Sequence, residues 1–141
     1  MNTTVETILL YTIAAGFLSI VYGFFTGKNI LNQSSGNAKM QDIASAIQIG
    51  AKAYLTRQYK TIAIVGVVVL VIVSIAFSPL VGLGYLIGAA LSGIAGYVGM
   101  LVSVEANVRT AEASRKGLAQ GLSVAFKSGA VTGMLVAGLA L

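Results

Sequence analysis

Four carboxylates, Glu6, Asp42, Glu105 and Glu112, are the side chains best suited to hold a metal ion or transfer a proton, since the chain has no histidine and no cysteine. No two are placed for metal-assisted hydrolysis, and no nucleophile stands beside a base. The missing residue types also exclude disulfides, zinc sites and histidine catalysis. We therefore predict no catalytic residue, no cofactor-binding residue and no metal ligand within these 141 residues.

The polar residues near the third apolar stretch form a candidate cluster. Glu105 and Arg109 are four residues apart with the acid first, the favourable orientation for an ion pair on a helix. Asn107 and Glu112 extend the cluster, which we interpret as structural rather than as a substrate site. Lys127 lies about a turn inside the last apolar stretch. It is predicted to snorkel to the interface rather than to mark an ion pathway.

The basic residues determine the expected topology. All nine lysines and arginines fall within 28–60 and 109–127, while hydrophobic residues make up 57% of the chain and mean hydropathy is +0.90. Cytoplasmic loops carry the positive excess in membrane proteins, so both segments are predicted to be cytoplasmic and the N-terminus outside. The charges flank apolar spans and form no patch with interleaved aromatics, which argues against a nucleic-acid partner.

The uncharged runs 7–25 and 61–104 are long enough to cross a bilayer, and Ser78-Pro79 divides the second of them. A signal peptide needs a positively charged start, which the sequence lacks before residue 28. The last run has only 14 uncharged residues after Lys127, so we expect a truncated span and a longer protein. The predicted fold is all-α with four transmembrane helices, over about 4–27, 60–77, 82–105 and 118–141, joined by cytoplasmic segments 28–59 and 106–117.

Small residues recur at every fourth position in three of the spans, and such stripes let membrane helices approach closely. The second span, rich in valine and isoleucine around Gly66, has no stripe and is predicted to face lipid. Three packing faces exceed the needs of four helices, so further helices are predicted. The stripes are Ala15, Ser19, Gly23 and Gly27; Gly84, Gly88, Ser92 and Gly96; and Gly117, Gly121, Ala125, Gly129, Gly133 and Ala137.

The segment between the first two spans is the most distinctive. Residues 35–39 lack the frame of a phosphate loop and are interpreted as a turn that leads into a helix. No breaker follows until Phe77, so one helix is predicted from Lys39 to Phe77, about 58 Å long and extended into the cytoplasm. An amphipathic helix lying on the membrane is the alternative, but its polar face would be mixed rather than strongly basic.

Several segments in succession resemble the N-terminal signature of membrane-bound, ion-pumping pyrophosphatases, from Tyr22 onward and in the order and spacing of that family. They are Gly36 to Met40, Ile43-Ala44, Ala46 to Gln48, Gly50-Ala51, Ala53 to Leu55, Arg57 to Tyr59, Thr61-Ile62, Gly96 to Met100, Ala106 to Ala111, Ala125 to Val131 and Gly133-Met134.

The resemblance implies a large helical pump of the cell membrane that works as a homodimer. Such pumps hydrolyse magnesium-bound pyrophosphate and export protons, or in some members sodium ions. The aspartate-rich substrate motif of the family follows its fourth span, and this chain has no aspartate after Asp42, so no substrate or Mg²⁺ ligand is carried over. We expect the N-terminal, non-catalytic part of such a pump, inactive alone, whose partners are the lipid bilayer and the remaining helices of the same polypeptide.

Two other functions are alternatives to this one. A self-contained oligomeric scaffold or subunit would also show surplus packing faces. A proton-conducting ring subunit would need a carboxylate at mid-membrane depth, and this sequence has none.

Overall fold

The computed structural model describes residues 3–141, so positions 1 and 2 of the predicted N-terminal portion lie outside it. It contains four helices, α1 (Thr3–Leu31), α2 (Ala38–Ala76), α3 (Pro79–Ser114) and α4 (Leu118–Ala140). Each is long and apolar enough to cross a membrane, which confirms the predicted all-α fold with four candidate spans. The described residues contain no strand.

The helices begin and end where the sequence supplies caps. The Asn37 side chain accepts a hydrogen bond of 3.0 Å from the Met40 amide and so starts α2, as the predicted turn at 35–39 requires. Gly36 just before it has φ +79°, a conformation that favours glycine. Ser78 caps α3 in the same way and Pro79 occupies its first turn. The break between α2 and α3 is therefore residues 77–78, whereas the predicted spans 60–77 and 82–105 leave residues 78–81 between them.

The continuous α2 confirms that one helix runs through the region predicted as 39–77. Its 39 residues correspond to about 58 Å, roughly twice the hydrocarbon thickness of a bilayer. No residue in its most apolar window is buried in the described chain.

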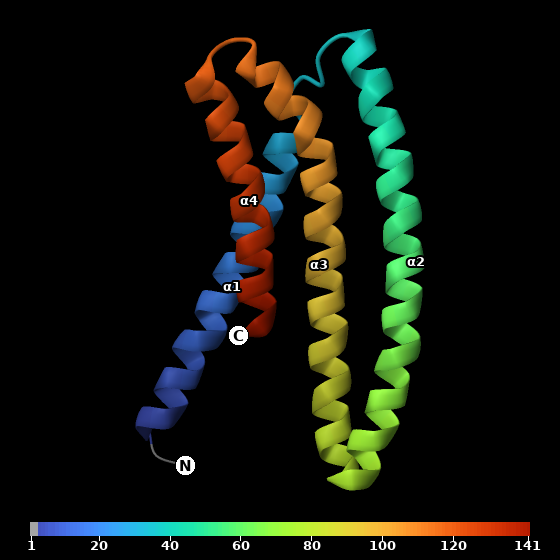
Figure 1. Cartoon of the computed structure of the whole chain (residues 1–141). Coiled ribbons are helices and arrows are strands. Elements are labelled where there is room, and N and C mark those ends of the chain that lie inside the picture. The colour runs from blue at the N-terminus through green and yellow to red at the C-terminus, as the bar shows by residue number, and fades with distance from the viewer. Residues whose placement is uncertain (1–2) are drawn as a thin grey trace.

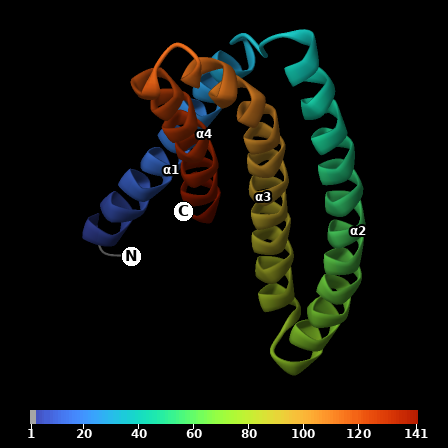
Figure 2. The same ribbon diagram turned by 45° about the horizontal axis from the view of Figure 1, so that its top comes forward.

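The helices pack in the spatial order α1, α4, α3, α2. Figure 1 shows α2 beside α3 alone, and α1 crossing α4 obliquely on the opposite side; the turned view in Figure 2 agrees. The last turns of α1 and α3 and the first turns of α2 and α4 meet at one end, which we call the loop end. The turn between α2 and α3 lies at the other end.

A small buried core joins α1, α3 and α4 near the loop end. Ile30 and Val131 are almost completely buried there. Gly23 and Gly27 of α1 lie against Val131 or Leu135 of α4, as expected for the predicted stripe in the first span. The core consists of Ile30, Ala106, Val124 and Val131, with Val102, Ala113 and Leu135 packed around it.

Only part of the small-residue stripe predicted in the last span packs against other helices in the structure. Gly121 is buried, but a Cβ added at Gly129 or Gly133 would meet nothing within 4 Å. The residues that pack against α1 and α3 follow a neighbouring face of α4, at three- and four-residue spacing. They are Gly121, Val124, Ser128, Val131 and Gly138. In α3, Gly84 and Gly88 are likewise open, whereas Gly96 lies under the Tyr59 ring.

Candidate functional site

Charged residues gather at the loop end, where Arg109 is the central side chain. Its Nη1 donates to Glu105 Oε2 at 2.9 Å and to the Glu105 carbonyl oxygen at 2.6 Å. This confirms the predicted i,i+4 ion pair. Nη2 donates to the main-chain oxygen of Leu31 at 2.9 Å, so the same guanidinium also holds the end of α1. The Arg109 side chain is 13% exposed and that of Glu105 is 37% exposed.

The Arg109–Leu31 bond satisfies a carbonyl that α1 cannot use itself. The last four carbonyls of a helix lack partners within it, and the negative end of its dipole favours a cation. Arg109 supplies both the donor and the charge. Its remaining nitrogen, Nε, is buried and donates to no acceptor among residues 3–141.

A second ion pair lies one turn further along α3. Glu112 Oε2 accepts from Arg115 Nη1 at 3.0 Å, and Arg115 is 60% exposed. The same carboxylate oxygen lies close to Gly36, where an added Cβ would be 3.1 Å away. Glu112 thus touches the turn that starts α2.

The turn itself is held by short-range polar contacts. The Gly36 amide donates to Ser34 Oγ at 3.2 Å, and Gln41 Nε2 donates to the Gly36 carbonyl oxygen at 2.9 Å. Together with the Asn37 cap, these bonds fix the direction in which α2 leaves the loop end.

A cavity of about 570 Å³ lies between this turn, the end of α3 and the start of α4. Arg109 and Lys116 give it positive charge, and Glu112 is its one acidic lining residue. The polar lining residues are Gln33, Ser34, Arg109, Glu112, Lys116, Gln120 and Ser123. Such a lining suits an anion or a polar segment, but it offers no nucleophile beside a base.

The remaining predicted residues lie elsewhere. Asn107 faces α2, where it lines a small groove with Met40, so it does not join the cluster around Arg109. Lys127 is exposed on α4 and forms no ion pair with the described residues. Sequence reasoning missed the Leu31 carbonyl, since a main-chain acceptor leaves no signal in the residue type. It also missed Gln33, Ser34 and Gln120, which only the fold brings beside Arg109.

The carboxylates do not assemble into a metal site within the described chain. No three of its His, Cys, Asp or Glu residues lie close enough together to hold an ion. Mg²⁺ needs near-octahedral oxygen ligands, usually including one or two carboxylates. That the metal and substrate ligands lie outside this portion of the protein stays a prediction.

Comparison with known proteins identifies the family. The family model described as inorganic H+ pyrophosphatase matches residues 17–141. A K(+)-insensitive pyrophosphate-energized proton pump of Methanosarcina mazei is 43% identical over 138 residues, which cover 96% of this chain and 21% of that protein.

Two further relatives agree with this match. A putative K(+)-stimulated pyrophosphate-energized sodium pump of Clostridium tetani is 40% identical, over 92% of this chain and 19% of its own length. A K(+)-insensitive pyrophosphate-energized proton pump of Caldanaerobacter subterraneus is 38% identical, over 94% of this chain and 20% of its own length. The chain thus spans about a fifth of the length of the curated relatives it matches. The family match covers α2, α3, α4 and the second half of α1, and this chain belongs to the inorganic H+ pyrophosphatase family.

Proposed function

We propose that this chain is the N-terminal structural part of a pyrophosphate-energised ion pump. The pump would hydrolyse pyrophosphate with Mg²⁺ and use the energy to export protons, or alternatively sodium ions, across the cell membrane. The family match over residues 17–141 carries this proposal, because it extends along nearly the whole chain. The relatives' names include both proton and sodium pumps, so the pumped ion has to be measured.

The proposed role of these helices is non-catalytic. Two observations support it: no three metal-ligating side chains gather among the described residues, and Arg109 is engaged with Glu105 and with the last turn of α1. In this proposal α1, α3 and α4 form a packed unit. The long α2 extends beyond the bilayer to support the cytoplasmic part that holds pyrophosphate. The remaining helices of the same polypeptide, and a second copy of it in a homodimer, would complete the pump.

The charge distribution supports an orientation with the loop end in the cytoplasm. Twelve of the thirteen acidic and basic residues, all except Glu6, lie within 28–60 and 105–127. The loop joining α1 to α2 and the turn joining α3 to α4 both lie at the loop end. Positive-inside topology would then place the N-terminus and the α2–α3 turn outside.

The test is to express the whole protein that carries this chain and to assay membrane vesicles for pyrophosphate hydrolysis and ion uptake. Hydrolysis should require Mg²⁺, and an uncoupler should abolish a proton gradient but not sodium uptake. The four helices expressed alone should give membrane-inserted protein with no hydrolysis above that of empty vesicles. Hydrolysis by the isolated helices would refute the non-catalytic role. Absence of pyrophosphate hydrolysis from the whole protein would refute the proposed pump function.

A further inference from the structure

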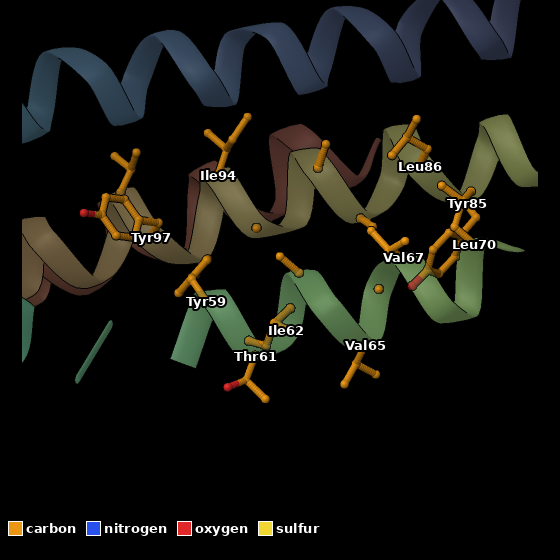
Figure 3. Close-up of a pocket in the computed structure, with 16 residues that line it drawn as sticks. Tyr59, Thr61, Ile62, Val65, Val67, Leu70, Tyr85, Leu86, Ile94 and Tyr97 are labelled. Atoms are coloured by element: carbon orange, nitrogen blue, oxygen red, sulfur yellow. The ribbon is translucent and has the colours of Figure 1, made fainter. Parts of the chain in front are cut away.

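An apolar groove of about 800 Å³ lies between α2 and α3, on the far side of α3 from the buried core. In Figure 3, Tyr59 and Tyr97 lie at one end of the groove, and Leu70 and Tyr85 lie at the other. All sixteen lining residues are uncharged, and Ile62, Val67 and Ile94 are each more than half exposed. Such a surface is costly in water and favourable next to hydrocarbon.

Two tyrosines resting on glycines of the facing helix create this groove. Tyr59 of α2 packs over Gly93 and Gly96, where a Cβ at Gly96 would lie 2.8 Å from the tyrosine hydroxyl. Tyr85 of α3 reaches back toward Gly66, 3.8 Å from the position of a Cβ there. The two rings hold the helices apart at both ends. Between them the lining includes Ala63, Ala89 and Ala90, which are too small to fill the space.

The end of the groove at Tyr59 is bordered by positive charge. Lys60, Ala63 and Val67 follow one face of α2 at i, i+3 and i+7, and the last two line the groove. Arg57 lies one turn before Lys60. Both cations are exposed, and neither forms an ion pair with the described residues, whose two ion pairs are Arg109–Glu105 and Arg115–Glu112.

The dimensions fit a lipid chain better than a helix. From Tyr59 to Leu70 the groove follows α2 for about 17 Å, close to half of the roughly 30 Å hydrocarbon core and thus to one leaflet. One tyrosine side chain spans its width, whereas a helix with its side chains is about 10 Å across. An acyl chain is a single file of methylenes. We propose that the groove binds an acyl chain of an anionic phospholipid whose phosphate lies against Lys60 and Arg57.

The proposal goes beyond the pump function and can be tested without any turnover. The whole protein, purified and delipidated, is titrated with phosphatidylglycerol, and bound lipid is counted by native mass spectrometry. Neutral phosphatidylcholine is titrated in parallel. We expect one tightly retained phosphatidylglycerol per polypeptide, with weaker retention of phosphatidylcholine. Lys60→Gln should weaken the affinity for phosphatidylglycerol about fivefold, and adding Arg57→Gln should weaken it about fivefold again.

Two further variants distinguish lipid binding in the groove from a nonspecific attraction of anionic lipid to basic side chains. Ala90→Phe fills the groove and leaves both cations in place, so it should abolish the tight site. Lys127→Gln removes a lysine of α4 that does not line the groove and should leave the affinity unchanged.

Three results would overturn the proposal. Unchanged affinity for phosphatidylglycerol in the Lys60→Gln, Arg57→Gln double variant would show that these two cations do not contact the headgroup. Displacement of the lipid by inorganic phosphate alone would indicate a free-anion site. Cross-linking of a cysteine at Val67 to a segment outside residues 1–141 would show that another part of the protein fills the groove.

Discussion

Arg109 donates a hydrogen bond of 2.9 Å to the main-chain oxygen of Leu31, 78 residues earlier in the chain. The bond joins the end of α1 to α3, two helices that otherwise meet little because α4 lies between them. The same guanidinium binds Glu105, so one side chain links an ion pair within α3 to the last turn of α1. Replacing Arg109 would therefore break both links at once.

The first prediction concerns this link. Arg109→Gln should lower the free energy of unfolding of the whole protein by about 2 kcal/mol, because it leaves a partly buried carboxylate and the Leu31 carbonyl without their charged donor. Arg115→Gln is the matched control. Arg115 is 60% exposed and bonds only within its own turn, so its replacement should cost less, about 0.5–1 kcal/mol, even though its partner Glu112 is only 18% exposed. Denaturant titration in detergent would measure both, and equal losses would contradict the role assigned to Arg109.

The second prediction concerns the crossing of α1 and α4. A Cβ at Gly138 would lie 2.6 Å from the Gly16 carbonyl oxygen and 3.0 Å from side-chain carbons of Ser19 and Ile20. Gly138→Ala should therefore force the helices apart and cost about 1–3 kcal/mol.

Gly50→Ala is its control, since a Cβ there would meet nothing within 4 Å of the described residues. Alanine is the better helix former, so this variant should gain up to about 1 kcal/mol. Thermal unfolding of the two variants should thus move in opposite directions. A stabilised Gly138→Ala variant would mean that α1 and α4 do not cross as the structure describes.

Much of this fold follows from the sequence because membrane helices leave local signals. The uncharged runs, the polar turn at 35–39 and Pro79 indicate where helices begin and end, and the spacing of Glu105 and Arg109 predicts their pairing. The choice of packing face is less predictable. Glycines at every fourth position of α4 allow close approach, but they do not determine which face α1 and α3 occupy. The Leu31 acceptor and the groove beside Tyr59 depend on how the helices are arranged in space, so no residue pattern shows them.

The third prediction concerns the open stripe on α4. A Cβ at Gly129 or Gly133 would meet nothing within 4 Å in the described chain, and we expect these glycines to pack against further helices of the pump. Replacing both by leucine should reduce pyrophosphate-driven ion uptake at least as much as hydrolysis, because the helices they seat would be displaced. Ala14→Leu, on an exposed position of α1, is the control and should leave both rates unchanged. Coupled pumping at the wild-type rate after the double replacement would contradict this role.

The fourth prediction tests the orientation. Ser78 lies in the turn between α2 and α3, and Ser35 lies in the loop before α2, at the opposite end of the helices. With the loop end in the cytoplasm, a cysteine at Ser78 should react with an impermeant maleimide added to intact cells, because it lies on the outer surface. A cysteine at Ser35 should react only after the cells are opened. Residues 1–141 have no cysteine of their own, and the same protein without the introduced cysteine is the labelling control. The reverse pattern would show that the basic segments face outward and would refute the topology inferred from charge.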